Sequence, residues 1–388
     1  MKSDLSTICT YVTDKITVDK LTVDNYISTE NMLPNKCGVV KASSLPQVKQ
    51  VTHYKKGDVL VSNIRPYFKK IWLATNEGGC SNDVLVMRAR KDIETSFLYY
   101  VLSEDDFFEY STVTGKGTKM PRGDKTAIMK YQVPIITHEE QQKIVGLLNK
   151  LDKKININKE INDNLQQQLR TIFKAEFTDN PELENITQIP LSELCHVVTK
   201  GTTPTTLGKP FVESGINFIK AESILDDHSI DKSKFAFIDE ETNALLKRSI
   251  IHVGDVVFTI AGTLGRFALI DENVLPANTN QAVAIIRADV EKVLPEYIYT
   301  CFIGEWHTDY YAKRVQQAVQ ANLSLTTIKS LPIPLLDEAK MSEYLSLILP
   351  LIKAIKTNEA QNEKLAALRD NLLPKLMSGE IDVSAVQL

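Results

Sequence analysis

The chain has 388 residues, of which 43% are hydrophobic and 24% charged, and its net charge is −4. This composition favours two or three globular domains and argues against a uniformly basic nucleic-acid-binding surface. The five cysteines are widely spaced, no run approaches the length of a membrane span, and the N-terminus lacks an apolar signal region, so we expect a cytoplasmic protein without a membrane contact.

The charge is unevenly distributed along the chain. Residues 1–130 contain 19 Lys and Arg against 15 Asp and Glu, a balance of +4. Residues 186–336 contain 13 against 17, a balance of −4. A polyanion would therefore meet local basic loops rather than one continuous positive face.

The predicted elements come in the same order twice. Short β-branched runs follow Gly-Asp turns, as in "DVLVS" at 58–62, and are typical of strands. A helix is expected around 95–109, followed by a strand marked by proline and then a long helix. The second half repeats this order, with its first helix expected around 295–311.

Six segments of the first half recur in order in the second. The pairs are 5–13 and 191–199, 26–32 and 218–224, 55–62 and 252–259, 82–89 and 280–288, 97–102 and 297–302, and 128–135 and 328–335. The offset grows from 186 and then stays at 200, which indicates a duplicated domain whose second copy has about fourteen extra residues.

The two long helices share an unusual pattern on their apolar faces. Leu and Ile recur at steps of three and four, which is the spacing of a coiled-coil seam, but two central positions in each helix are asparagine. These are Asn158, Asn162, Asn358 and Asn362. Solvated amides on a polar face are one explanation. Buried amides that fix the helix register are the other, because a shifted register leaves donors and acceptors unpaired.

An antiparallel arrangement pairs Asn158 with Asn362 and Asn162 with Asn358, since both pairs sum to 520. A parallel arrangement also matches asparagine to asparagine, but it loses the two-fold relation between the copies. The antiparallel seam would extend over about 36 Å, which is close to one turn of B-DNA.

Three segments are specific enough to suggest a family. They are "VPIITHEEQQKIVGLLNKLD", "LPIPLLDEAKMSEYLSLILPLI" and the C-terminal "LRDNLLPKLMSGEI". Together with the duplication, they resemble the specificity subunit of a type I restriction–modification system. The first junction has "EEQQKIV" where the second has "DEAKMSEYL", which puts equal partner binding at the two helices in doubt.

The resemblance implies an α+β chain with two target-recognition domains separated by two long antiparallel helices that form a coiled coil. We expect target-recognition domains at 1–136 and 179–336, long helices at 137–178 and 337–378, and a tail at 379–388. The implied partners are double-stranded DNA, two methyltransferase subunits and, through the complex, restriction subunits. The resemblance implies no catalysis by this subunit and no cofactor.

The motifs of related enzymes are absent from the sequence. There is no "NPP" or "DPP" motif of an amino-methyltransferase, no phosphate-binding loop, and no histidine pair or cysteine cluster with metal-ligand spacing. The sequence therefore predicts no catalytic and no metal-binding residues.

Loops rich in hydrogen-bond donors are the candidate DNA contacts, since Arg and Lys bind phosphate and guanine while Asn and Gln bind adenine. In the first copy the candidates are Arg65, Lys69, Asn82, Lys116, Lys119, Arg122 and Lys125. In the second copy they are Lys200, Thr202, Thr203, Arg266, Asn280, Gln281, Arg314, Gln316, Gln317 and Asn322. For each loop, an ordinary solvated turn is the alternative.

The favoured function is sequence-specific recognition of a bipartite, asymmetric DNA target. A non-catalytic scaffold with two protein-binding domains is the alternative, and the negative balance of the second domain favours it slightly. A third hypothesis is that the chain is an enzyme whose active site the sequence motifs do not reveal.

Overall fold

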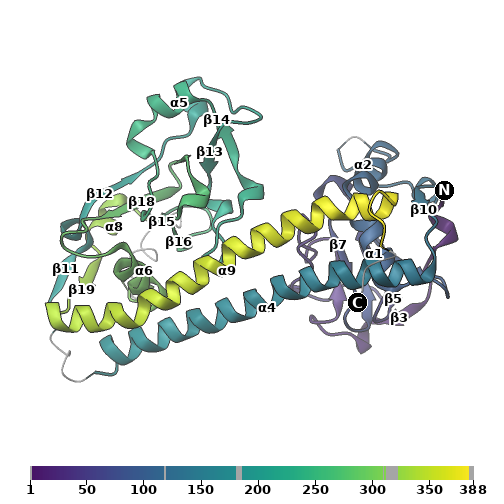
Figure 1. The fold of residues 1–388 in the computed structure, drawn as a ribbon, viewed down its shortest axis with the longest axis horizontal. Coiled ribbons are helices and arrows are strands. Elements are labelled where there is room, and N and C mark those ends of the chain that lie inside the picture. Colours follow the sequence, from purple (N-terminus) through teal and green to yellow (C-terminus); the bar gives the residue numbers. More distant parts are fainter. Residues whose placement is uncertain (1, 118, 181–185, 309, 312–321, 384–388) are drawn as a thin grey trace. The chain divides into compact units, whose positions relative to one another are not determined.

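The computed structural model describes residues 2–117, 119–180, 186–308, 310–311 and 322–383. The chain divides into two compact units, Met1–Lys154 with Lys364–Leu388, and Ile155–Glu363. Each unit contains one α+β domain and part of both long helices (Figure 1). The long helices thus belong to both units, whereas the sequence treated them as separate segments.

The first domain contains a four-stranded antiparallel sheet with the strand order β2-β9-β6-β7. Its strands are β2 (Cys9–Tyr11), β6 (Val59–Ser62), β7 (Ile71–Leu73) and β9 (Val84–Ala89). A second sheet, of order β3-β5-β8-β4, is formed by β3 (Lys15–Thr17), β4 (Tyr26–Ile27), β5 (Gln50–Tyr54) and β8 (Gly78–Cys80). The domain closes where β1 (Lys2–Asp4) pairs with β10 (Gln132–Pro134).

The helix expected around 95–109 is two helices in the structure. They are α1 (Thr95–Ser103) and α2 (Asp105–Val113), and Glu104 between them has an extended backbone. Asp105 and Asp106 lie in the first turn of α2, where acidic side chains stabilise a helix N-terminus. A short helix, α3 (Lys125–Ile128), precedes β10 and is capped by the Asp124 carboxylate.

The second domain repeats this plan. Its four-stranded sheet has the order β12-β18-β15-β16, with β12 (Cys195–Lys200), β15 (Val256–Thr259), β16 (Phe267–Leu269) and β18 (Val283–Ala288). A sheet of order β14-β13-β17 contains β13 (Ile216–Ile219), β14 (Ala236–Ile238) and β17 (Ala277–Thr279). The helices are α5 (Glu240–Leu245), α6 (Pro295–Ile303) and α8 (Leu325–Lys329), and β11 (Gln188–Pro190) pairs with β19 (Pro332–Pro334).

A buried ion pair recurs at the same place in both sheets. In the first domain, Arg88 binds the Asp58 carboxylate through Nε and Nη2, both at 2.7 Å. In the second, Arg287 binds the Asp255 carboxylate in the same way, at 2.7 and 2.8 Å. Each aspartate follows a glycine with positive φ and also caps the preceding turn. The Gly-Asp turns of the sequence therefore place a buried carboxylate beside the first residue of a core strand.

The long helices are α4 (His138–Phe177) and α9 (Glu338–Ser378), which lie side by side in each unit (Figure 1). The α4 helix begins with a capping box, because Thr137 and Glu140 each accept a hydrogen bond from the other's backbone N–H. Asp337 precedes α9, and its carboxylate accepts from the Lys340 N–H. These caps explain why the helices begin within a residue of the positions expected from the sequence.

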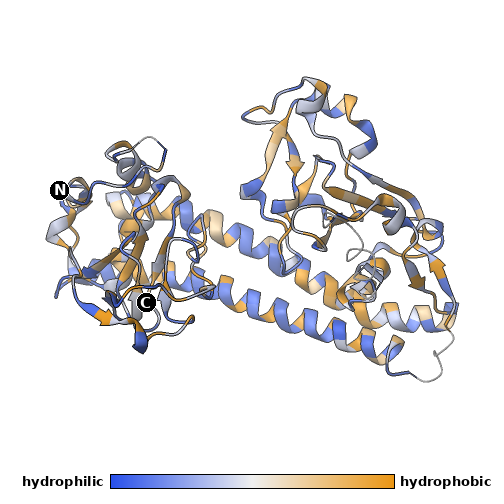
Figure 2. Ribbon diagram, turned by 180° about the vertical axis from the view of Figure 1, so that it is seen from behind, coloured by the Kyte–Doolittle hydropathy of each residue, from blue (hydrophilic) through white to orange (hydrophobic). Residues whose placement is uncertain are grey.

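Both long helices contribute to the hydrophobic cores. In the first unit, Leu148 of α4 and Leu376 of α9 pack into the core that contains Phe97. In the second unit, Phe173 of α4 and Ile348 of α9 pack into the core that contains Phe302. Hydrophobic and hydrophilic segments alternate along both helices, as expected for helices with one buried face (Figure 2).

Candidate nucleic-acid interface

The three candidate loops of the first domain are joined by backbone hydrogen bonds. The Arg65 N–H donates to the Pro121 carbonyl at 2.8 Å, and the Gly123 N–H donates to the Asn63 carbonyl at 3.1 Å. The Asn63 N–H in turn donates to the Asp83 carbonyl at 2.8 Å. Segments 62–70, 78–83 and 114–125, which are far apart in sequence, therefore form one surface.

Several basic side chains on this surface have acidic partners within the domain. Lys69 pairs with Asp105 at 2.9 Å, Arg122 pairs with Asp83 at 3.1 Å, and Lys116 pairs with Asp124 at 2.5 Å. The Lys116 ammonium and the capping N–H groups of α3 lower the pKa of Asp124 to about 2. Exposed pairs of this kind contribute little to stability, so exchange of the carboxylate for a DNA phosphate costs little.

The other candidates of this domain differ in exposure. Asn82, Lys119 and Lys125 are exposed, which suits a contact with a ligand. Arg65 is half-buried and has a positive φ of 50°, and its Nε is buried without a partner among the described residues.

In the second domain, two of the candidate loops are adjacent. The Gly201 N–H donates to the Asn280 carbonyl at 3.1 Å, and the Thr203 hydroxyl donates to the Gln281 side chain. Thr202 accepts a hydrogen bond of 3.3 Å from Arg248, a residue that the sequence analysis did not select. Lys200 is half-buried at the end of β12, and Gln281 is exposed. This surface presents mainly hydroxyl and amide groups.

Arg266 is already bonded within its domain. Its Nε and Nη2 bind the Asp226 carboxylate at 2.6 and 2.7 Å, and its Nη1 donates to the Ile224 carbonyl at 3.2 Å. A DNA phosphate can therefore bind the Arg266 guanidinium only if it displaces the Asp226 carboxylate. Arg314, Gln316 and Gln317 lie outside the described residues, while Asn322 is exposed.

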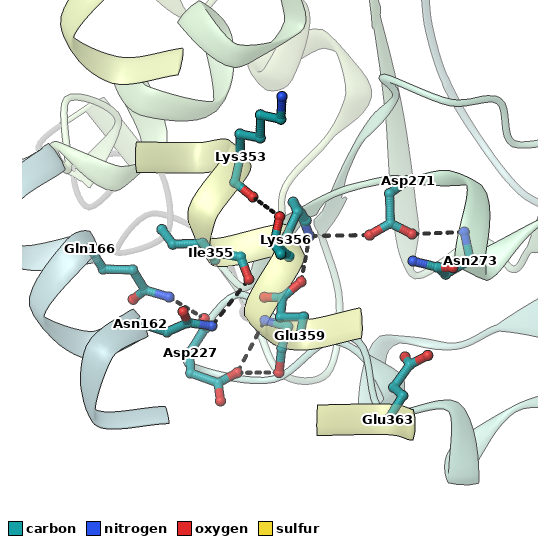
Figure 3. A network of polar contacts seen from close by, with 12 residues as sticks. Asn162, Gln166, Asp227, Asp271, Asn273, Lys353, Ile355, Lys356, Glu359 and Glu363 are labelled. Carbon is teal, nitrogen blue, oxygen red and sulfur yellow. Dashed lines mark hydrogen bonds and ion pairs between the residues drawn. The ribbon is translucent and has the colours of Figure 1, made fainter. Parts of the chain in front are cut away.

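The four helix asparagines lie opposite one another in the second unit. Asn158 donates to Asn362 at 2.9 Å and to Gln361 at 2.7 Å, and Asn358 donates to Asn162 at 2.8 Å. Asn162 also donates to the Ile355 carbonyl at 3.3 Å (Figure 3). The hydrogen-bonded partners are those that sum to 520 in the sequence.

A polar network beside the asparagines joins both helices to the second domain (Figure 3). Gln166 of α4 donates to the Asp227 carbonyl at 2.6 Å, and Lys356 of α9 pairs with Glu359 at 2.9 Å and faces Asp271 at 4.0 Å. Burial raises the pKa of Glu359, and Lys356 opposes that rise. These groups line a cavity of about 290 Å³ inside the second unit.

Among the residues that the structure describes, no group of three or more His, Cys, Asp or Glu side chains is arranged to hold a metal ion. No helix in the described part of the chain is both long and apolar enough to cross a membrane.

The model of the family described as the type I restriction modification DNA specificity domain matches residues 8–167 and 184–367, which is more than half of the chain. The chain belongs to this family. Each match contains one α+β domain and most of the long helix that follows it, so the duplication found in the sequence is a duplication of the specificity domain.

Two relatives that match most of this chain are named as specificity subunits of type I restriction enzymes. The chain is 24% identical to the type I restriction enzyme MjaIX specificity subunit of Methanocaldococcus jannaschii, over 85% of this chain and 79% of that protein. It is also 24% identical to the HindI specificity subunit of Haemophilus influenzae, over 92% and 94%. The solved S subunit of the type I restriction–modification system of M. genitalium matches with a TM-score of 0.51 and 15% identity, over 97% of this chain and 96% of that one, which shows a shared fold.

Sequence reasoning missed the acidic partners of the first specificity domain. Asp83, Asp105 and Asp124 stand beside the candidate basic residues, but two of the three ion pairs join residues more than 30 positions apart. Only the Lys116–Asp124 pair lies within one loop, and the "GDK" segment there is the one signal that the sequence offered. A Cβ at Gly201 would lie within 2.0 Å of the Thr279 carbonyl oxygen, so this loop position requires glycine for packing.

Proposed function

We propose that this chain is the DNA-recognising, non-catalytic subunit of a type I restriction–modification complex. Each specificity domain reads one half of a bipartite target. The observation that carries the proposal is that each domain gathers donor-rich loops from distant segments onto one surface, within a chain that consists of two specificity domains.

The different chemistry of the two surfaces supports unlike half-sites. The first has Lys119, Arg122 and Lys125, which suit phosphate and guanine contacts. The second has Thr202 and Gln281, which suit contacts to adenine and to sugar–phosphate oxygens. An asymmetric target follows, because two surfaces with different donors favour different bases.

We further propose that α4 and α9 form an antiparallel coiled coil that sets the spacing between the half-sites. The asparagine pairs at its centre fix the register, because a shift of one heptad would leave buried amides without partners. Inserting one heptad in each helix, symmetrically about the asparagines, adds about 10 Å at 1.5 Å per residue. The preferred spacer should then lengthen by about three base pairs.

The proposed partners are duplex DNA, two methyltransferase subunits and restriction subunits that join through the complex. The junctions before the two helices differ, with "EEQQKIV" in the first and "DEAKMSEYL" in the second, so the two methyltransferase contacts need not be equally strong.

Methylation mapping of the host genome, with the gene intact and deleted, tests the proposal. A bipartite modified motif with unlike halves should disappear on deletion. An unchanged methylation pattern, together with equal binding of all duplexes by the purified complex, would contradict DNA recognition and favour a protein scaffold. Methyl transfer or cleavage by the isolated chain would contradict the non-catalytic assignment.

A further inference from the structure

The turn between β6 and β7 presents two aromatic side chains to solvent. Tyr67 is 48% exposed and Phe68 is 39% exposed, and their ring centroids lie 4.8 Å apart. Between them and the core, Pro66 is buried and anchors the turn. Two adjacent aromatic rings that remain exposed to water are energetically unfavourable, and such apolar patches often mark a binding site.

The backbone that carries these rings is held in an unusual conformation. Arg65 and Lys69, on either side of the aromatic pair, have φ values of 50° and 51°. The facing turn has Asn35 at 55° and Lys36 at 63°. These four are among only six non-glycine residues with positive φ in the described part of the chain, and such strain tends to collect at functional sites.

The two turns hold each other in place. The Asn35 N–H donates to the Phe68 carbonyl and the Lys36 N–H donates to the Lys69 carbonyl, both at 2.9 Å. The ammonium groups of Lys36 and Lys69 share the Asp105 carboxylate, at 2.8 and 2.9 Å. The aromatic side chains therefore project from a pre-organised backbone, which reduces the entropy lost when they contact a ligand.

The equivalent turn of the second domain is built without this strain. Val61 pairs with Ile71 at the end of the first hairpin, and Phe258 pairs with Phe267 at the end of the second. Counted from these pairs, Arg65 corresponds to Gly262 and Lys69 to Gly265, whose φ values are 78° and 87°. Glycine adopts this conformation without steric cost, so the second domain, whose turn is one residue shorter, has left-handed backbone at both positions with less strain.

The side chains between the two left-handed positions also differ. The second domain has Leu264 there, and Leu264 packs against the hydrophobic core. In the first domain, Tyr67 and Phe68 face solvent instead. The first turn thus presents an exposed apolar surface where the second packs a leucine against the core.

We propose that Tyr67 and Phe68 are specificity-determining residues that contact thymine methyl groups in the half-site read by the first domain. This inference rests on the proposed function. The thymine C5-methyl is the apolar group that a base pair offers in the major groove. The turn is bonded to the basic loop through the Arg65 N–H and the Pro121 carbonyl, and residues 1–130 carry a balance of +4, so duplex DNA is the occupant whose charge complements this surface.

The test uses the complex with its methyltransferase subunits and a duplex that carries the mapped target. In one duplex, every thymine of the first half-site is replaced by uracil, which removes only the methyl groups. Wild-type affinity should fall about fourfold for each contacted methyl. The double variant Tyr67→Ala/Phe68→Ala should bind both duplexes equally, and as weakly as wild type binds the uracil duplex.

Three controls separate the causes. Val48→Ala, at another exposed apolar position of the first domain, should leave affinity unchanged. The aromatic variant should keep the wild-type dependence of affinity on salt, whereas removal of Lys119 and Lys125 should reduce that dependence. Uracil in the second half-site should affect wild type and the aromatic variant equally.

The outcomes distinguish this inference from the proposed function. If wild type fails to discriminate the target from random duplex, the proposed function is contradicted. If wild type discriminates but is insensitive to uracil in the first half-site, or if that half-site contains no A·T pair, the inference is overturned. Loss of methyltransferase association in the aromatic variant, with unchanged DNA affinity, would assign the pair to a protein contact and also overturn it. The uracil arm changes only the DNA, so insensitivity of wild type to uracil overturns the inference even if the variant is unstable.

Discussion

The two specificity domains share their buried framework and differ at their loops. Both contain a four-stranded sheet with the same strand order and a buried Asp–Arg pair at the same turn. Their candidate loops differ in nearly every side chain, with mainly lysines and arginines in the first domain and more hydroxyl and amide side chains in the second. Duplication has thus kept the groups that hold the sheet and left the exposed groups free to change.

The hairpin turn shows how the framework constrains the loops. Both domains require left-handed backbone at two positions of this turn, and only the first fills them with side chains. The position of a loop in the fold therefore dictates its backbone, while its side chains depend on what the loop contacts.

The largest effect on stability is expected when the Asp–Arg pair that both domains share is broken. Asp255→Ala should destabilise the second unit by about 3–5 kcal/mol, because it removes the buried carboxylate that binds the half-buried Arg287 guanidinium. Asp58→Ala should cost less in the first unit, since the Arg88 side chain is 36% exposed and that of Arg287 only 26%. Denaturant unfolding of the full chain measures both. Asp24→Ala, in an exposed ion pair, is the control, and equal costs for all three variants would contradict a shared buried framework.

A second difference between the units concerns pH. His228 and His307 are 9% and 8% exposed and lie against Phe267 in the second unit. Burial lowers the pKa of each to about 4, and Arg170 adds to the effect at His228. The folded state thus favours neutral histidine. The second unit should therefore lose stability as pH falls from about 6.5 to about 4, and each histidine should contribute about 2–3 kcal/mol to this loss.

Variants at these histidines isolate the effect from the titration of carboxylates. His228→Asn suits the left-handed backbone at this position, where φ is 64°. It should flatten the decline in unfolding free energy between pH 6.5 and 4, whereas His53→Asn in the first domain should not. An unchanged pH dependence in His228→Asn and in His307→Asn would show that these residues are not the cause.

Substitution of the asparagine pairs should have a smaller effect, and it should increase stability. Replacing Asn158, Asn162, Asn358 and Asn362 together with Leu should raise the thermal stability of the second unit by about 1 kcal/mol or more. The Oδ1 atom of Asn158 is buried and has no hydrogen-bond partner among the residues that the structure describes, and leucine removes that unsatisfied acceptor. Asn362→Leu alone should instead be destabilising, since Asn158 loses one of its two acceptors. A lower melting temperature in the fourfold variant would contradict the register role.

The smallest expected effect is at the hairpin turn. Arg65→Gly gives the first domain the residue type of Gly262 and relieves a left-handed side-chain conformation. The relief of about 1–2 kcal/mol is offset in part by the greater freedom of glycine in the unfolded chain, so a net gain of about 0.5 kcal/mol is expected. Thermal unfolding measures it, and Gly262→Ala in the second domain should be destabilising. A loss of stability in Arg65→Gly would show that its side chain stabilises the fold.

Much of the framework could be predicted from the sequence, because it depends on local patterns. The duplicated order of elements, the limits of the long helices and the asparagine partners follow from spacing and from the capping residues Thr137 and Asp337. The break at Glu104 was missed because apolar residues continue on both sides of it.

The candidate surface was less accessible to sequence reasoning. The sequence singles out the loops as donor-rich segments, but their adjacency depends on bonds such as that between Arg65 and Pro121, which join residues far apart in the chain. The left-handed backbone at Arg65 and Lys69 was hidden because these residue types rarely adopt it. Comparison with the glycines of the second copy was the only sequence signal for that turn.

We propose that the two domains read different halves of one DNA target independently. Methylation mapping tests this in cells that express either the wild-type chain or a chain whose residues 1–130 are exchanged for another specificity domain. We expect one half of the modified motif to change, while the other half and the spacer length stay the same. A change in both halves, or in neither, would show that the domains do not read the target independently.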